Sequence, residues 1–335
     1  MALLKIPENY HSFLSLRQTE YAIKKVKDFF ERDLATELNL IRVSAPLFVD
    51  PASGLNDNLN GVERPVTFDL FSGEQLEIVH SLAKWKRYAL QMYGFRPGEG
   101  LYTDMNAIRR DEETDNIHSM FVDQWDWEKI ITREERTEAT LKKTVRCIYD
   151  ALRHTEQYIV NEYDFIGSLL PEKITFLTAQ ELEDEMPDRT PREREYLAAK
   201  RHGAIFLQGI GGTLRGSGAP HDGRSPDYDD WSLNGDIIVY YPVLDIALEL
   251  SSMGIRVDEE AMRRQLAIRH CEDRAELPFH RALLAGELPY TVGGGIGQSR
   301  MCMFFLRKAH IGEVQSSYWT PETLAACRAA GIHLL

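Results

Sequence analysis

The chain has 335 residues and a formal net charge of −13, with 39 Lys and Arg residues against 52 Asp and Glu residues. A hydrophobic content of 43% and an aromatic content of 10% indicate a globular protein with a sizeable core and exclude a disordered chain. The negative charge argues against a protein whose main task is to grip a nucleic-acid backbone.

The first predicted element is a helix over Leu16–Leu38, which a capping box at Ser15 and Gln18 opens. Its apolar residues recur at helical spacing and predict one buried face. A strand over residues 40–43 follows. Another short strand, over residues 76–79, leads into a helix that starts at Ser81.

Residues 100–108 and 120–128 predict two strands joined by a charged turn. In the second strand, Trp125 and Trp127 alternate with three polar residues, Gln124, Asp126 and Glu128. Successive side chains of a strand point to opposite faces. We therefore expect the tryptophans in the core and the polar side chains on the other face of the sheet.

The second half of the chain predicts further helices at residues 137–163, from Thr190 and from Asp258, and strands at 204–207, 236–241 and 244–250. A glycine-rich loop over 209–226 is a candidate lid. The last elements expected are a strand that ends at Val292, a glycine turn over 293–297 and a helix from Ser299. Short links between strands favour an α+β fold, a mostly antiparallel sheet flanked by helices, in a single domain over residues 1–335.

Several common functions lack their motifs. The four cysteines form no C-x-x-C pair, so neither a zinc knuckle nor a redox motif is present. Their wide spacing and the lack of an apolar leader predict reduced thiols and a cytoplasmic location. No apolar run reaches the length of a membrane span. The glycines at 293–297 lack the third glycine of a dinucleotide fingerprint, and no glycine-rich segment contains the Gly-Lys-Ser/Thr of a P-loop.

Two arginines stand out as candidate anion ligands. Arg300 falls in the first turn of a predicted helix, where a cation opposes the helix dipole, so an anionic ligand explains it better. Arg109 ends a predicted strand opposite Gln124 and Asp126, where it could direct a bidentate donor at a phosphate or carboxylate. Taken alone, an arginine at this position is more often an exposed surface residue than a ligand.

Some carboxylates and hydroxyls have both a structural and a functional interpretation. Asp236, at the start of a predicted strand, and Glu249, on the next strand, form a candidate magnesium site, although spacing alone favours solvated carboxylates. Lys86 is expected on a solvated helix face, and Ser81 is expected to cap that helix. The aspartates expected in a solvated turn are Asp227, Asp229 and Asp230.

Three segments in order resemble the motifs of class II aminoacyl-tRNA synthetases. Residues 38–48, after the long helix, resemble motif 1, which forms the dimer interface in that class. Residues 107–112 and 120–128 resemble motif 2, and residues 295–300 resemble motif 3. The resemblance implies that Arg109 holds the α-phosphate of ATP and that Arg300 stacks on adenine and reaches the γ-phosphate.

A closer resemblance covers nearly the whole chain. It is to the ammonia-dependent asparagine synthetases, the A type of aspartate–ammonia ligases. The segments that carry it are residues 57–59, 80–86, 98–103, 122–128, 226–231, 233–236, 249–256 and 293–300. The resemblance implies a homodimer with a synthetase-like core. Its substrates are L-aspartate, ammonia and ATP, and L-asparagine forms through a β-aspartyl-adenylate with release of AMP and pyrophosphate. Neither nucleic acid nor a membrane is implied.

The resemblance also assigns roles around the reactants. Asp236 and Glu249 would bind Mg2+ beside ATP. The α-carboxylate of aspartate would lie at Lys86 and Arg256, and its α-ammonium would lie at Asp126 and Asp229.

The remaining roles concern the reacting groups. Gln124 would donate to the reacting carboxyl oxygen, with Ser81 and Ser252 as further polar contacts. Asp57 would bind ammonium and is the candidate general base.

Two alternatives remain open at this point. A tRNA-dependent synthetase or its catalytic fragment would share the three motifs, but the chain has no room for an anticodon-binding barrel before its first predicted helix. A non-catalytic synthetase-like protein would typically lack a motif arginine or a metal carboxylate. This chain has Arg109, Arg300, Asp236 and Glu249, so the ligase is preferred.

Overall fold

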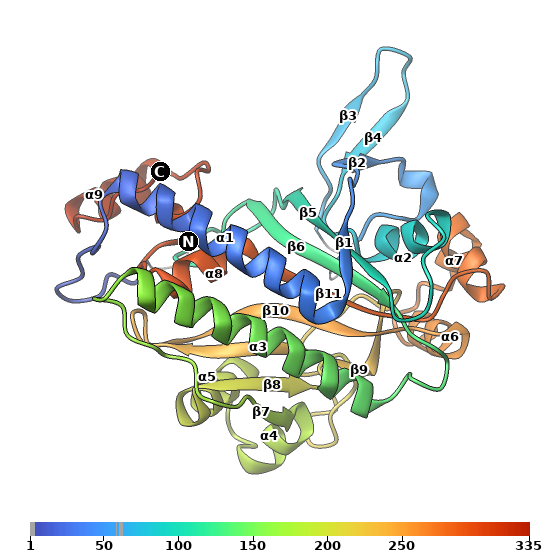
Figure 1. Ribbon diagram of the computed structural model, residues 1–335. Coiled ribbons are helices and arrows are strands. Elements are labelled where there is room, and N and C mark those ends of the chain that lie inside the picture. Colours follow the sequence, from blue (N-terminus) through green and yellow to red (C-terminus); the bar gives the residue numbers. More distant parts are fainter. Residues whose placement is uncertain (1–3, 58, 60–62) are drawn as a thin grey trace.

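The computed structural model describes residues 4–57, 59 and 63–335. Two parts of the sequence considered above lie outside this description. They are residues 1–3 at the start of the chain, and Asn58 in the segment 57–59. The main sheet has eight strands (Figure 1). In spatial order they are β1 (Leu40–Arg42), β5 (Gly100–Ile108), β6 (Phe121–Ile130), β11 (Thr291–Gly297), β10 (Ile246–Arg256), β9 (Asp229–Tyr241), β8 (Ala204–Gln208) and β7 (Thr175–Thr178).

The pairing within this sheet is mixed. The six strands from β5 to β8 pair antiparallel, as predicted, whereas β1 pairs parallel with β5 and β7 pairs parallel with β8. Both parallel strands are edge strands, reached by a helical connection instead of a hairpin. Five of the seven strand pairs are antiparallel, so the expectation of a mostly antiparallel sheet holds, and the two edge pairs make the sheet a mixed one.

Helices surround the sheet on several sides. The longer ones are α1 (Leu16–Leu38), α2 (Ala83–Met92), α3 (Glu138–Glu162), α5 (Pro191–His202) and α6 (Glu259–Ile268). The shorter ones are α4 (Ala179–Glu185), α7 (Pro278–Leu284), α8 (Gln298–Phe305), α9 (Pro321–Ala329) and the 3-10 turns η1 (Pro51–Ser53), η2 (Glu272–Glu276) and η3 (Ile311–Glu313). A second, three-stranded sheet, which the sequence did not reveal, joins β2 (Phe48–Val49), β4 (Gln75–Ile78) and β3 (Thr67–Asp69).

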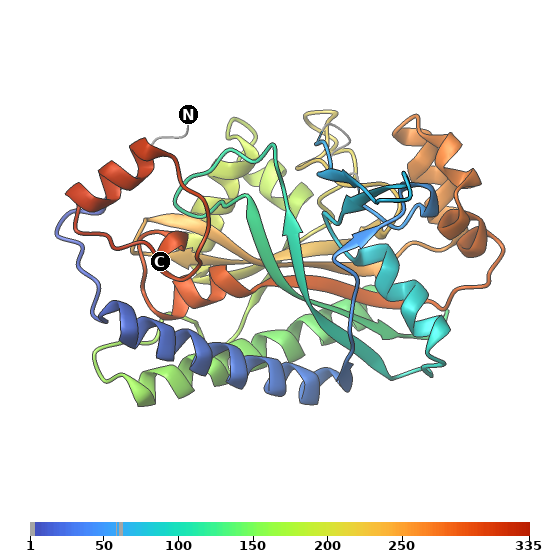
Figure 2. The same ribbon diagram turned by 90° about the horizontal axis from the view of Figure 1, so that it is seen from above.

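Helices α1 and α3 run side by side along one face of the main sheet (Figures 1 and 2). The predicted apolar stripe of α1 is buried there, and the capping box at Ser15 and Gln18 is present. Phe30 of α1 packs on Trp125 of β6 with ring centroids 4.9 Å apart. Trp125 and Trp127 are fully buried in this core, as predicted from their alternation. The polar side chains of β6 consequently point to the opposite face of the sheet.

Two boundaries differ from the sequence expectations. Strand β11 runs through the glycines at 293–297, where a turn was expected, because these residues pair with both β6 and β10. Strand β9 begins at Asp229, so Asp236 lies in the middle of a strand instead of at its start. Glycine is unfavourable in a strand unless something needs the space, and the functional site described below supplies that need.

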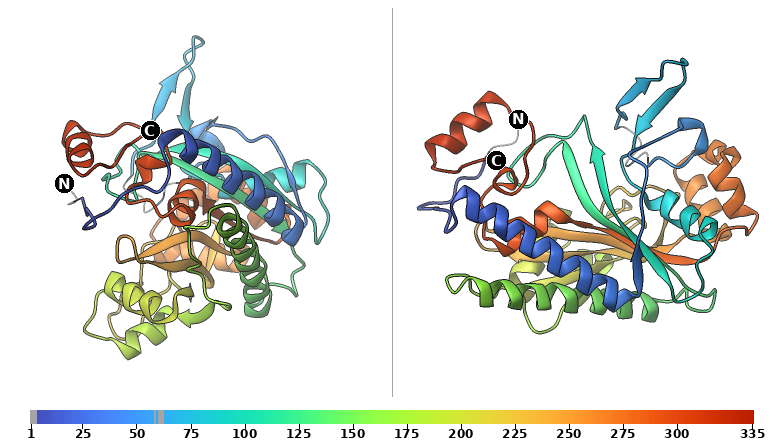
Figure 3. Two further views of the ribbon diagram at one scale, coloured as in Figure 1. Left: turned by 60° about the vertical axis from the view of Figure 1, so that its left-hand side comes forward. Right: turned by 45° about the horizontal axis from the view of Figure 1, so that its top comes forward.

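Smaller elements lie at the periphery of the main sheet (Figures 1 and 3). The hairpin of β3 and β4 projects from the body, and α6 and α7 lie at one end of the sheet (Figures 1 and 3). Within the part of the chain that is described, none of the helices combines the length and the apolarity that crossing a membrane requires.

A buried histidine anchors the C-terminal segment. His310 is fully buried, packs edge-on against Trp319 at 4.6 Å between ring centroids, and accepts a hydrogen bond from Gly312 N at Nδ1 (3.0 Å). That bond requires Nδ1 to be unprotonated, so the neutral tautomer carries its proton on Nε2. Burial lowers the pKa of His310 to about 4.

We predict that this histidine makes stability pH-dependent. Its folded pKa lies below the unfolded value of about 6.5, so the unfolded chain takes up the proton first as the pH falls. The free energy of unfolding should therefore decrease between about pH 6.5 and pH 4, by up to about 1.4 kcal/mol per pH unit from this group. Denaturant titrations at several pH values should show a smaller slope for His310→Gln than for wild type, whereas the exposed-site control His11→Gln should keep the wild-type slope. Equal slopes in all three proteins would contradict the prediction.

Candidate active site

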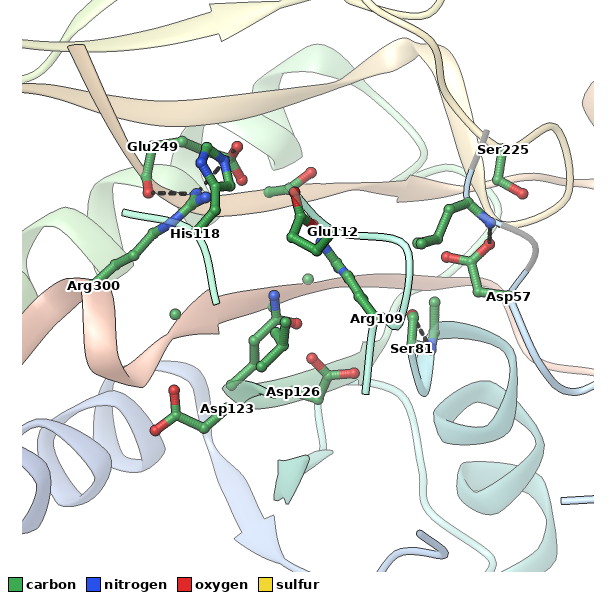
Figure 4. Close-up of a pocket in the computed structure, with 18 of the residues that line it drawn as sticks. Asp57, Ser81, Arg109, Glu112, His118, Asp123, Asp126, Ser225, Glu249 and Arg300 are labelled. Carbon is green, nitrogen blue, oxygen red and sulfur yellow. Dashed lines mark hydrogen bonds and ion pairs between the residues drawn. The ribbon is translucent and has the colours of Figure 1, made fainter. Parts of the chain in front are cut away.

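A cavity of about 430 Å³ opens on the face of the main sheet opposite α1 and α3. Figure 4 shows Arg300 and Glu249 at one end, Asp57 and Ser81 at the other, and Arg109 between them. All but one of the residues proposed from the sequence line this cavity. They are Asp57, Ser81, Lys86, Arg109, Gln124, Asp126, Asp229, Glu249, Ser252, Arg256 and Arg300. The exception is Asp236.

Strand register explains how distant segments meet here. Asp126 of β6 pairs with Gly295 of β11, Gly295 pairs with Ser252 of β10, and Ser252 pairs with Asp236 of β9. Residues directly opposite one another in a sheet point to the same face, so these four positions form one row across the cavity floor. We call this row the middle row.

One end of the cavity floor is a buried cluster of paired charges. Arg256 donates from Nε and Nη2 to the two carboxylate oxygens of Glu128 (3.0 and 2.8 Å) and from Nη1 to Asp229 (2.5 Å). Lys86 Nζ lies 3.2 Å from Asp126 Oδ2 and donates to the carbonyl of Gly294 at 2.9 Å. We call the cluster of Lys86, Asp126, Glu128, Asp229 and Arg256 the paired end.

The paired end corrects the expectation that Lys86 lies on a solvated helix face. Lys86 is 1% exposed because α2 packs against β6 and β11. Burial of a charge is costly unless a partner is close, and here every charge has an opposite charge within hydrogen-bond reach. The cluster is therefore a structured site and not a random surface group.

Titration at the paired end follows burial and partner charge. Burial opposes ionisation of Glu128, but the charges of Arg256 and Lys86 outweigh it and lower the pKa of this carboxyl. Burial dominates at Asp229, whose pKa is raised in spite of Arg256. Burial likewise lowers the pKa of Lys86. Glu128 is thus held ionised as the counter-ion of Arg256, whereas burial shifts Asp229 toward its protonated form.

The glycines of β11 provide the space for these side chains. A Cβ at Gly293 would overlap the carboxylate of Glu128, and one at Gly295 would lie 2.8 Å from Asp126 Oδ1 and overlap the amide of Gln124. These distances are shorter than real contacts, so larger residues cannot replace these glycines without displacing the site. The run at 293–297 is therefore a strand whose glycines leave room for its neighbours, not a turn.

Two arginines with few buried counter-ions line the rest of the cavity, Arg300 beside Glu249 and Arg109 between them and Asp57 (Figure 4). We call the part that holds Arg109 and Arg300 the arginine end. Arg300, in the first turn of α8 as predicted, donates from Nη1 to the carbonyl of Glu249 at 3.2 Å and lies 3.6 Å from its carboxylate. Among the described residues, the buried Nε of Arg109 has no hydrogen-bond partner. Gln124 lies between this end and the paired end on β6. Such a field suits the phosphates of a nucleotide.

Asp236 lies behind an arginine that sequence reasoning missed. Arg224, in the 209–226 loop, forms a short ion pair with Asp236 Oδ2, and its Nη1 donates to Ser252 Oγ at 2.9 Å. The second carboxylate oxygen of Asp236 is buried and has no partner among the described residues. Burial raises the pKa of Asp236, whereas Arg300 and Arg224 outweigh burial at Glu249 and lower its pKa. The sequence did not mark Arg224, because a loop has no periodicity that shows which side chains point inward, and arginines in loops are usually exposed.

Asp57, on the segment after η1, lies beside Ser81 at the end of the cavity opposite Arg300 and Glu249 (Figure 4). Its Oδ1 accepts from Leu59 N at 2.9 Å, while Oδ2 is buried without a partner among the described residues. Burial raises the pKa of this carboxyl, and the charge of Lys84 only partly offsets the effect. Nearby, Ser81 Oγ accepts from Ala83 N at 3.1 Å, but the N-cap of α2 is Leu82, which makes no side-chain capping bond, so the expectation that Ser81 caps this helix is wrong.

The aspartates expected in a solvated turn are buried instead. Asp227 is fully buried and lies 2.9 to 3.3 Å from Lys84, Arg274 and His280. Burial opposes its ionisation, but these three neighbours lower its pKa well below the usual value. Asp230 pairs with Arg136 at 3.1 Å. The segment after the glycine loop is consequently fastened to α2 and α7, which positions Asp229 at the paired end.

Comparison with known proteins identifies the family. A sequence model described as aspartate-ammonia ligase matches residues 17–331. An aspartate–ammonia ligase of Clostridium perfringens (strain SM101 / Type A) is 64% identical over 337 residues, covering 100% of both chains. One of Fusobacterium nucleatum subsp. nucleatum is 64% identical over 326 residues, which is 97% of this chain and 99% of the relative. The chain belongs to the aspartate–ammonia ligase family.

Solved structures place this member of the aspartate–ammonia ligase family in a wider fold group. An asparaginyl-tRNA synthetase of Entamoeba histolytica in complex with asparaginyl-adenylate aligns with a TM-score of 0.62 and 12% identity, over 90% of this chain and 66% of that one. The enzyme of Pyrococcus horikoshii aligns with a TM-score of 0.58 and 14% identity, over 89% and 68%. At such identities the likeness shows the fold alone, which is that of class II synthetase catalytic domains.

We predict that the glycine strand tolerates no side chain. In Gly293→Ala, the added Cβ overlaps the buried Glu128 carboxylate, so the free energy of unfolding should fall by about 1–3 kcal/mol. Gly212→Ala is the matched control, because a Cβ there meets nothing within 4 Å and the residue has no positive φ. Denaturant unfolding of both variants measures the difference. Equal stability of the two variants would show that the cavity floor is looser than described.

Proposed function

We propose that this chain makes L-asparagine from L-aspartate, ATP and ammonia through a β-aspartyl-adenylate, releasing AMP and pyrophosphate. The observation that carries the proposal is the division of one cavity into a paired end and an arginine end, in a chain of the aspartate–ammonia ligase family. An amino acid carries one positive and one negative group beside its reacting carboxylate, which fits the paired end. A nucleotide triphosphate fits the arginine end.

The paired end would hold aspartate by exchange of partners. Lys86 and Arg256 would contact the α-carboxylate, and Asp126 and Asp229 would contact the α-ammonium. Each charge is already desolvated and oriented in the free protein, so binding replaces one buried pair by another instead of burying new charge. The β-carboxylate would then point along the floor toward the arginine end, with Ser81 and Ser252 as further polar contacts.

Adenylation joins two anions, so the site must neutralise charge. An oxygen of the β-carboxylate attacks the α-phosphorus of ATP, an O–P bond forms, and the bond from that phosphorus to pyrophosphate breaks. Arg109 would hold the α-phosphate as charge builds on it, and Arg300 would hold adenine and the γ-phosphate. Gln124 would donate to the reacting carboxyl oxygen.

Asp236 and Glu249 fit a role as magnesium ligands. Glu249 lines the cavity beside Arg300, whereas Asp236 lies behind Arg224 and has one buried oxygen that lacks a partner among the described residues. Hard oxygen ligands are those that Mg2+ prefers. When bound, the ion supplies charge neutralisation for the phosphates and assists the departure of pyrophosphate.

Amide formation requires a neutral nucleophile. Ammonium first loses a proton, ammonia attacks the acyl carbon, the bond to AMP breaks, and a further proton leaves the new amide nitrogen. Asp57 is suited to bind ammonium and accept a proton, because its buried Oδ2 has no hydrogen-bond partner among the described residues and burial raises its pKa.

The remaining parts of the proposal concern assembly and location. We infer one catalytic domain over residues 1–335 and a homodimer that uses α1, β1 and the following segment, where Ile41, Leu47 and Phe48 are exposed apolar residues. A cytoplasmic location is proposed because ATP and aspartate are available there, and all four cysteines are free thiols. No nucleic acid or membrane is part of the proposed reaction.

The test of the proposed function is an RNA-free incubation with aspartate, Mg-ATP and ammonium chloride in which asparagine and the nucleotide product are assayed together. Asparagine with equal amounts of AMP supports the adenylate route, and Arg109→Ala should lower both by at least about 100-fold. Asparagine with ADP would indicate an acyl-phosphate route and overturn these roles. Aspartate-dependent ATP–pyrophosphate exchange without asparagine would indicate another acceptor, such as tRNA.

We predict that Asp57→Asn separates the two half-reactions. Aspartate-dependent ATP–pyrophosphate exchange should persist, because Asp57 is not at the phosphates, whereas asparagine formation should fall by about 100-fold or more because no base accepts the proton. In wild type, the amide step should be lost as the pH falls through the raised pKa of Asp57. The exposed-site variant Asp69→Asn is the control. Equal loss of both half-reactions would assign Asp57 to adenylation instead.

A further inference from the structure

Arg224 is a cation that reaches the cavity from a loop. It lines the cavity together with its neighbours Asp222, Gly223 and Ser225. Its guanidinium contacts Asp236 and Ser252, lies 3.6 Å from Asp222, and has a buried Nε without a partner among the described residues. Lys86 and Arg256 come from a helix and a strand. Arg224 differs from these two cations because it belongs to a loop.

The position of Arg224 along the cavity floor is informative. Its two side-chain partners, Asp236 and Ser252, both belong to the middle row. On β6, the middle-row residue is Asp126. Glu128 follows it by two residues at the paired end, and Gln124 precedes it by two residues on the side of the arginine end. The guanidinium thus lies over the junction at which an amino-acid carboxylate and an α-phosphate would meet.

Asp236, the ion-pair partner of Arg224, is also a proposed ligand of the magnesium ion that accompanies the nucleotide. Asp236 lies behind the guanidinium and does not line the cavity, so it can reach a nucleotide-bound cation only when Arg224 moves away. The backbone next to Arg224 is held, because Trp231 Nε1 donates to Ser225 O at 3.1 Å and Asp227 is fixed by ion pairs. A rotation of the long side chain about a fixed backbone is therefore the movement that this geometry permits.

We propose that Arg224 is a further catalytic residue for adenylation, whose guanidinium leaves Asp236 when the nucleotide binds and contacts the β-carboxylate and the α-phosphate as their O–P bond forms. This inference rests on the proposed function. In the free protein the guanidinium and Asp236 neutralise each other, and in the complex each faces an opposite charge from the ligand. The exchange keeps the buried junction balanced in both states.

The experiment compares Arg224→Ala with Arg215→Ala, a variant of an arginine in the same loop that is exposed and pairs with Asp184. Aspartate-dependent ATP–pyrophosphate exchange should fall by about 100-fold in Arg224→Ala and stay near wild type in Arg215→Ala. Added guanidinium chloride, at concentrations too low to unfold either protein, should restore at least about tenfold of the lost rate in Arg224→Ala only. Rescue by the missing group is not expected of a structural role.

A binding measurement gives a readout apart from turnover. By calorimetry, a sulfamoyl analogue of the β-aspartyl-adenylate should bind Arg224→Gln at least about tenfold more weakly than wild type, while adenosine, which has neither the acyl group nor the phosphate, binds both alike. An Arg224→Ala exchange rate within about threefold of Arg215→Ala, a loss that guanidinium does not restore, or equal binding of the analogue would each overturn the inference. Wild-type protein that makes no asparagine in the same assay would instead refute the proposed function.

Discussion

The structure depends on burying opposite charges beside one another on one face of a sheet. Arg256 is held between Glu128 and Asp229, and Lys86 is held beside Asp126, all with almost no solvent exposure. Such charges are tolerable in a protein interior only with partners at hydrogen-bond distance. That requirement dictates the rest of the cavity floor, because the side chains above it need the volume that Gly293 and Gly295 leave empty. The opposite face of the same strands carries the tryptophan core, so the sheet separates an apolar layer from a charged one.

The cavity is chemically directional as a consequence. At the paired end the charges compensate one another before any ligand arrives, which suits a zwitterionic amino acid. Among the described residues, the buried Nε of Arg109 has no hydrogen-bond partner, and the carboxylate paired with Arg300 is that of the half-exposed Glu249. A polyanion gains most where positive charge is least compensated. The two ends meet over the middle row, and this separation allows one site to bring two anions together in a defined order.

The fastening of the loop is the other structural condition. Asp227, with Lys84, Arg274 and His280 around it, ties the segment after the glycine-rich loop to α2 and α7. The same ion pairs position Asp229 to contact Arg256. They also leave Arg224, three residues before Asp227, at the cavity. Asp227 does not line the cavity itself, but its ion pairs fix the backbone that positions Arg224 and Asp229 there.

Periodicity along the chain was sufficient to predict the helices α1 and α3, the strands β5 and β6 and the two faces of β6, because these features depend on local spacing alone. The family resemblance carried the candidate roles of the arginines and carboxylates, and all of these residues except Asp236 meet in one cavity. Only the tertiary structure decided that residues 293–297 are a strand, that Lys86 and Asp227 are buried, and that Arg224 covers Asp236. Each of these depends on contacts between residues far apart in sequence. A glycine or a charged residue has no intrinsic preference that reveals which distant side chain will occupy the space beside it.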